Sequence, residues 1–173
     1  MKELYTLLII LIPFVGFGQL TYVPDDNFEQ ALIDMGYDDI LDDSVITSNI
    51  NTVTQLILSY YGIQDLTGIE DFQNLESLDC SNNNLIGLDL SQNLDLQTLS
   101  CFGNNLTELD VSQNINLQAL SCRNNNLIEL DLSQNVNLNL IYCYGNNLTE
   151  LDISQNVNLE YLHCSNNIMT ELD

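Results

Sequence analysis

The chain has 173 residues, and its 25 acidic and 2 basic side chains give a formal net charge of −23. This charge excludes a nucleic-acid-binding protein, which needs cations to displace counterions, and disfavours an anionic membrane surface as partner. Because 45% of the residues are hydrophobic, the chain is not a disordered acidic tail, and its length suits one domain with its own core. With a single His, catalysis would depend almost wholly on carboxylates.

Residues 1–18 have the anatomy of a secretory signal peptide. Lys2 provides a short positive region, an apolar run extends to Phe17, and Gly16 and Gly18 occupy the −3 and −1 positions of a cleavage site. A transmembrane anchor would need about 20 apolar residues, more than this run provides. We therefore expect a secreted or cell-surface protein without membrane insertion after the signal is cleaved.

Residues 19–52 predict an N-terminal cap that contains a helix. The segment 23–27, VPDDN, is typical of a helix start, because proline is tolerated in the first turn and aspartates cap it. Gly36 suits the end of this helix, and Val45 and Ile46 suit a strand. The apolar residues spaced to share one helical face are Phe28, Ala31, Leu32 and Met35.

Residues 53–173 are repeats, with one unit of 22 residues, four of 21 and one that is incomplete. The 21-residue unit reads L-x-x-L-x-C-x-x-N-x-L-x-x-L-D. Its two most distinctive columns are Cys80, Cys101, Cys122, Cys143 and Cys164, and Asn83, Asn104, Asn125, Asn146 and Asn167. A period of this length indicates a solenoid, in which neighbouring units complete one another's core.

Alternation within the unit predicts a strand whose leucine and cysteine side chains point inward while their neighbours point outward. The asparagine column lies where the chain leaves the strand, so its amides can satisfy backbone groups of a buried turn. We expect a second column to do the same at the return turn: Asn93, Asn114, Asn135 and Asn156.

The unit resembles the leucine-rich repeat over residues 53–173, about 70% of the chain. Its length and cysteine column are most similar to internalin-type repeats of the internalin J-like, cysteine-ladder kind, and residues 19–52 are similar to internalin caps. The resemblance implies a leucine-rich-repeat solenoid of the α/β horseshoe class, with a parallel sheet on the concave face and little helix apart from the cap. It also implies a secreted, adhesin-like binding module with no enzymatic activity, whose concave face binds protein or glycan.

The cysteine column also raises the alternatives of a metal site and of disulfides. Thiols about 4.8 Å apart in a straight row cannot surround a zinc ion tetrahedrally. Parallel side chains suit the disulfide dihedral poorly, although a secreted protein favours disulfides in general. We therefore expect a reduced, buried ladder of apolar character.

A column of aspartates follows the last leucine of each unit and has two interpretations. Each carboxylate could accept a backbone N–H bond in its own turn, or the column, or the acidic segment 38–43, could collect calcium. Calcium is the only cofactor that the sequence suggests, and only as a weak prediction. The calcium candidates in the column are Asp89, Asp110, Asp131 and Asp152. A glycosidase is disfavoured because equivalent carboxylates lack the unequal environments it needs.

The outward strand positions differ between units and predict the binding site. Arg123 is expected between Phe102 and Tyr144, within range of cation–π contact. Aromatic residues with arginine are typical of interface hot spots, although exposed apolar residues are common and tyrosine suits strands in any case. The predicted ligand-binding residues are Phe102, Arg123, Leu140, Tyr142, Tyr144, Tyr161 and His163.

The last unit stops about 15 residues in, at Asp173, with no polar segment to cap it. We expect either a fragment of a longer protein or an end that pairs with another chain. The alternative function is a structural or calcium-stiffened surface spacer without a specific ligand.

Overall fold

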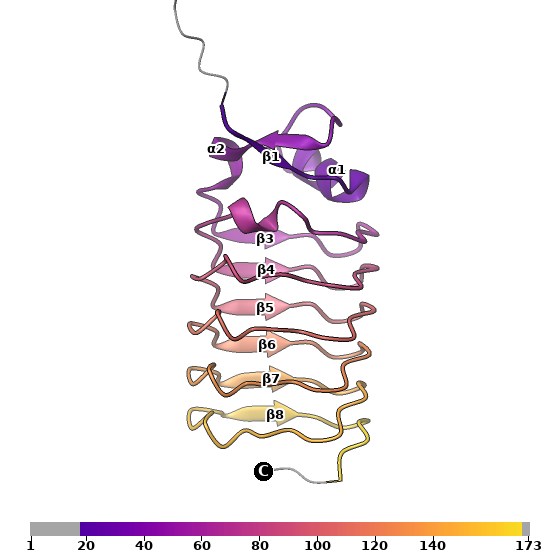
Figure 1. Cartoon of the computed structure of the whole chain (residues 1–173), viewed down its shortest axis with the longest axis vertical. Coiled ribbons are helices and arrows are strands. Elements are labelled where there is room, and N and C mark those ends of the chain that lie inside the picture. The colour runs from indigo at the N-terminus through magenta and orange to yellow at the C-terminus, as the bar shows by residue number, and fades with distance from the viewer. Residues whose placement is uncertain (1–17, 171–173) are drawn as a thin grey trace, which may run out of the picture.

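The computed structural model describes residues 18–170, so the predicted signal peptide lies outside this range except for Gly18. Figure 1 shows a cap at one end of a stack of parallel strands, so the predicted solenoid with little helix is confirmed. The cap contains β1 (Leu20–Tyr22), α1 (Asp26–Asp34), β2 (Ser44–Ile46) and α2 (Thr47–Ile50). None of the helices described in residues 18–170 is long and apolar enough to cross a membrane.

Within the described residues the repeats form one six-stranded parallel sheet, in which each strand pairs with the next along the chain. The strands are β3 (Gln55–Ile57), β4 (Ser77–Asp79), β5 (Thr98–Ser100), β6 (Ala119–Ser121), β7 (Leu140–Tyr142) and β8 (Tyr161–His163), and a 3-10 helix, η1 (Ile69–Asp71), follows β3. Leu78 lies beside Leu99, and Leu99 beside Leu120, so the sequence period becomes the strand register. Equivalent residues of adjacent repeats therefore stack on one another.

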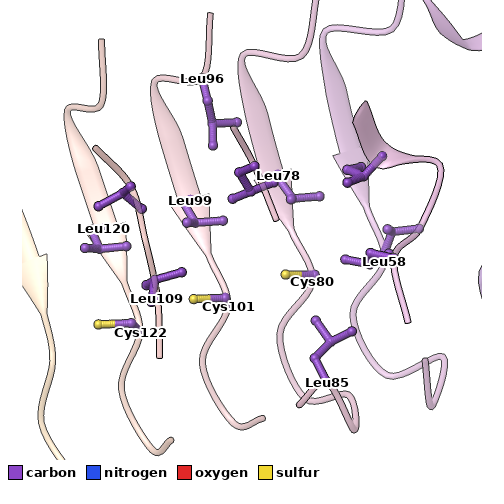
Figure 2. Close-up of a cluster of buried hydrophobic side chains, with 14 of the residues drawn as sticks. Leu58, Leu78, Cys80, Leu85, Leu96, Leu99, Cys101, Leu109, Leu120 and Cys122 are labelled. Atoms are coloured by element: carbon purple, nitrogen blue, oxygen red, sulfur yellow. The ribbon is translucent and has the colours of Figure 1, made fainter. Parts of the chain in front are cut away.

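The core is a set of apolar ladders inside the stack. Figure 2 shows Cys80, Cys101 and Cys122 pointing to the same side from equivalent positions, next to the leucines of the strands. All five cysteines are free thiols, and four are fully buried while Cys164 is half-buried. Burial raises the pKa of the Cys80 thiol to about 12, so this buried thiol stays protonated at neutral pH.

Two asparagine columns bind the turns of adjacent repeats together. The side-chain nitrogen of Asn104 donates to the carbonyl oxygens of Cys80 and Cys101, each at 3.0 Å, and its oxygen accepts from the backbone N–H of Leu85. At the return turn, the amide of Asn114 donates to the carbonyl oxygens of Leu90 and Asn93. Each amide thus satisfies carbonyls that the turns would otherwise bury unpaired, at a cost of about 1–3 kcal/mol for each group.

The cap is fastened to the first repeat by hydrogen bonds that join distant parts of the sequence. Asp25 caps α1 with one carboxylate oxygen and accepts the backbone N–H groups of Gln64 and Asp65 with the other. The Thr21 hydroxyl, buried on β1, donates to the Asp71 carboxylate at 2.6 Å. These bonds hold the apolar face of α1 over the end of the sheet, where Phe28 stacks with its ring centroid 6.3 Å from that of Phe72.

A left-handed backbone position follows the strand in every described repeat, at Tyr60 in the 22-residue unit, and its residue alternates between asparagine and glycine in the 21-residue units. Asn82, Asn124 and Asn166 have φ values of 52–54°, and between them Gly103 and Gly145 have φ values of 66° and 69°. A Cβ atom added to Gly103 would lie 2.7 Å from the side-chain oxygen of Asn82, and one on Gly145 would collide with Asn124 in the same way. A residue with a Cβ atom at Gly103 or Gly145 would therefore force the preceding asparagine side chain to move, in addition to the strain of a positive φ.

Candidate functional site

We call the outward-facing side of the sheet the sheet face. It comprises the outward residues of β4–β8 and the residue two positions after each strand. On β4 and β5 its strand residues are small and polar, such as Ser77 and Ser100, whereas β7 and β8 carry tyrosines. The parallel register stacks residues of the same column, so the variable positions that the sequence singled out come together on one surface.

Arg123 lies between two aromatic rings on the sheet face. Its guanidinium carbon lies 3.8 Å from the ring centroid of Phe102 in the preceding repeat and 5.6 Å from that of Tyr144 in the next. Both distances fall within the cation–π range of about 6 Å. The arrangement follows from the register, because the three residues occupy the same column of adjacent repeats and strands lie about 4.8 Å apart.

The aromatic contacts continue from Tyr144 across β7 and β8. The ring of His163 lies 4.4 Å from that of Tyr144 and 6.3 Å from that of Tyr142, centroid to centroid. Tyr142 in turn lies 5.2 Å from Tyr161, and the His163 Nε2 atom is 2.9 Å from the Ser165 hydroxyl. Six of the seven predicted site residues therefore form one connected cluster.

The seventh residue, Leu140, lies beside Tyr161 in the register of β7 and β8, at the edge of the cluster. Tyr161 is 49% exposed, and the other six predicted residues are half-buried by one another and by the sheet. Two strongly exposed apolar residues at the other end of the sheet, Ile57 and Tyr60, were not in the predicted set. Both occupy outward columns of the 22-residue unit, where a large apolar or aromatic residue could have been noticed. The prediction compared outward positions only among the later, 21-residue units.

A groove follows the aspartate column on another side of the solenoid. It has a volume of about 1150 Å³, and carboxylates from four repeats line it together with leucines such as Leu109 and Leu130. The Asp110 carboxylate accepts the backbone N–H of Ser112 at 2.8 Å, and this bond holds the pKa of Asp110 below its usual value. Equivalent bonds occur at Asp89, Asp131 and Asp152.

Each of these aspartates therefore accepts a backbone N–H in its own turn, as the first of the two interpretations of the column expects. Among residues 18–170, no group of three or more His, Cys, Asp or Glu side chains is placed to hold a metal ion. In the acidic loop of the cap, the buried Glu29 carboxylate accepts the backbone N–H groups of Asp42, Asp43 and Ser44. The loop is thus ordered by a carboxylate of the chain itself.

Comparison with known proteins shows that the chain is similar to leucine-rich-repeat proteins, internalins among them. No family model matches the chain. The chain is 39% identical over 72 residues to internalin J of Listeria monocytogenes, a segment that is 42% of this chain and 8% of that protein. The solved functional domain of the same internalin, described as including a cysteine ladder, superposes with a TM-score of 0.82 at 39% identity. That match covers 90% of this chain and 36% of the solved domain.

Two more distant structures share the fold. A leucine-rich-repeat protein of Leptospira interrogans is 27% identical, with a TM-score of 0.67, over 72% of this chain and 38% of its own. The ectodomain of the Arabidopsis thaliana receptor kinase GASSHO1/SCHENGEN3, solved in complex with CASPARIAN STRIP INTEGRITY FACTOR 2, is 26% identical, with a TM-score of 0.55. It matches 63% of this chain and 14% of its own. The chain thus spans well under two thirds of each of these relatives.

Proposed function

Because the chain is homologous to internalin J and shares its cysteine-ladder leucine-rich-repeat fold, we propose that it is a non-enzymatic, secreted or cell-surface binding module. Its sheet face binds a protein, in an adhesin-like role, through the cluster that runs from Phe102 to His163. The observation that carries this proposal is the connected aromatic and arginine cluster on an otherwise small and polar face.

The physical support is the composition and rigidity of this cluster. Tyrosine and arginine supply large contact areas, and hot spots in protein interfaces are enriched in them. The parallel sheet and the asparagine columns fix the positions of the rings, so little conformational entropy is lost when a partner binds. The matching plant ectodomain was solved with a bound protein factor, which favours a protein over a glycan as the ligand class.

The experiment is a binding screen of the purified full chain against arrays of extracellular proteins and of glycans, followed by affinity measurement with variants. We expect a protein ligand whose affinity falls at least tenfold in Tyr142→Ala, because truncation of an interface hot spot costs about 2 kcal/mol or more, above the roughly 1.4 kcal/mol that corresponds to tenfold. Thr98→Ala, on the same face but outside the cluster, is the matched control and should change affinity less than twofold. A ligand bound equally well by the wild type and by Tyr142→Ala would contradict the proposal, and a glycan ligand would correct its ligand class.

The alternative is a calcium-stiffened spacer without a ligand. A calcium site in the folded state must raise the melting temperature, by an amount that grows with the logarithm of the calcium concentration above its Kd. We expect melting curves in 1 mM calcium and in 1 mM EDTA to coincide once ionic strength is matched. A rise of several degrees with calcium alone, together with an empty binding screen, would favour the spacer.

A further inference from the structure

We infer that the partner presents a carboxylate next to an aromatic or aliphatic group, and that Arg123 is the residue that binds this carboxylate. The inference deepens the proposed function, since it names the chemistry that the sheet face would recognise. It rests on three observations: the unpaired state of the guanidinium, the absence of carboxylates around it, and the rings that cover its two faces.

Arg123 is the only arginine of a chain with 25 acidic residues, yet it pairs with none of them in the described structure. Its Nε atom is buried and has no hydrogen-bond partner among residues 18–170. A buried donor without a partner costs roughly 1–3 kcal/mol, so such groups call for an explanation. Because the Nε atom is shielded from solvent, an external anion would pair with the terminal nitrogens of the same guanidinium, for which the described residues supply no partner.

The part of the sheet face around Arg123 lacks carboxylates, although acidic residues flank it on both sides. The residue directly before each strand is Glu76 at β4 and Glu160 at β8, and both are exposed. Before the three strands between them, this position is occupied by the uncharged amides Gln97, Gln118 and Asn139. The outward residues of these three strands are also uncharged: Thr98, Ser100, Ala119, Ser121, Leu140 and Tyr142.

The uncharged residues around Arg123 weaken the negative electrostatic potential that the rest of the protein creates there. Asp79 on β4 lies two strands from β6, about 10 Å at strand spacing, which is close to the Debye length of about 8 Å in physiological salt. A single carboxylate that reaches Arg123 therefore meets one nearby cation and only screened repulsion. A polyanion would extend over the flanking acids and be repelled, which limits the ligand to an isolated negative group.

The geometry also defines what accompanies the carboxylate. The Phe102 and Tyr144 rings flank the guanidinium at 3.8 and 5.6 Å, and an anion would pair with it in its plane, where the N–H donors point. The group attached to the carboxylate would then lie against the rings of these residues. A protein segment with an acidic side chain or a terminal carboxylate beside an aromatic residue meets both requirements.

The test uses N-acetyl-L-phenylalanine, which has the carboxylate and the ring, and N-acetyl-L-phenylalaninamide, which has the ring alone. Because the sequence has one arginine, the Nε–Hε cross-peak in a nitrogen–proton NMR spectrum reports Arg123 without ambiguity. We expect the acid to shift this peak saturably at pH 6.5, and the amide to bind at least tenfold more weakly. Raising NaCl from 50 to 500 mM should weaken binding of the acid but not of the amide.

Two variants separate charge from shape. Arg123→Gln keeps a planar polar group but removes the charge, so the acid should bind it no better than the amide does. Arg123→Lys keeps the charge and should retain part of the preference for the acid. Equal binding of both probes to the wild type, or no shift of the Nε–Hε peak at 20 mM acid, would overturn the inference.

The outcome is distinguishable from failure of the proposed function. A protein ligand that depends on Tyr142 but binds Arg123→Gln with unchanged affinity would refute carboxylate recognition and leave the binding function intact. A carboxylate site demonstrated by NMR, together with an empty binding screen, would support carboxylate recognition by Arg123 and contradict the proposed protein-binding function.

Discussion

At the scale of single residues, the left-handed position after each strand is the most constrained site in the repeat. Gly103 adopts φ of 66°, which costs a residue with a Cβ atom about 1–2 kcal/mol, and it also faces the side-chain oxygen of Asn82. Asn82 itself tolerates the left-handed conformation, as asparagine often does. Backbone strain and side-chain packing therefore select the residue type together.

We predict that Gly103→Ala lowers the free energy of unfolding by about 1–3 kcal/mol, because conformational strain and the contact with Asn82 add. Gly87→Ala is the matched control, since Gly87 has no positive φ and nothing within 4 Å of an added Cβ. It should be neutral or slightly stabilising. Urea unfolding followed by circular dichroism measures both variants, and equal effects of the two substitutions would refute this account.

At the scale of the elements, each return turn is closed by an aspartate that accepts a backbone N–H from the serine two residues later. The bond from the Ser112 backbone N–H to Asp110, with the serine side chain as a second contributor, lowers the pKa of Asp110 below its usual value. A carboxylate whose pKa is lowered by folding stabilises the fold above its unfolded pKa. This contribution is lost as the pH falls through the folded pKa.

We therefore predict that Asp110→Ala lowers the urea midpoint at pH 7, and that the difference from the wild type shrinks below pH 3.8. Asp110→Asn is the matched control, because its side-chain oxygen accepts the same N–H bond without a charge. It should lose the charge-dependent part of the stability and keep the rest, so its midpoint at pH 7 should lie between those of Asp110→Ala and the wild type. A difference between Asp110→Ala and wild type that is the same at pH 7 and pH 3 would contradict the role of the carboxylate charge.

At the scale of the whole molecule, a net charge of −23 is spread over repeated columns and the cap. Like charges in equivalent positions of adjacent repeats stack, and their repulsion opposes the compact state. We predict that the melting temperature rises by several degrees between 10 and 500 mM NaCl, as screening shortens the range of this repulsion. Choline chloride should reproduce the effect, and a rise that only sodium produces would indicate a specific site instead.

The sequence period was enough to predict the solenoid, its strand register and the stacking of Arg123 between Phe102 and Tyr144. All three predictions follow from the 21-residue period, because a fixed repeat length in a parallel sheet aligns equivalent residues of adjacent repeats. The attachment of the cap could not be predicted, since the bond from Thr21 to Asp71 joins residues that no periodicity relates. The role of Gly103 was also missed, because the collision that explains it involves a side chain in the neighbouring repeat.

The alternation of asparagine and glycine after the strands gives the solenoid a structural period of two repeats rather than one. If one 21-residue unit were deleted between Asn82 and Asn124, two asparagines would face each other where the second has a Cβ atom in the path of the first. Removal of two consecutive units would restore the original neighbours. Removal of the unit that carries Asn124 would instead place Gly103 beside Gly145, and neither residue has the side chain that collides. A shortened version of this protein should therefore lose either a pair of repeats or a unit whose left-handed residue is asparagine.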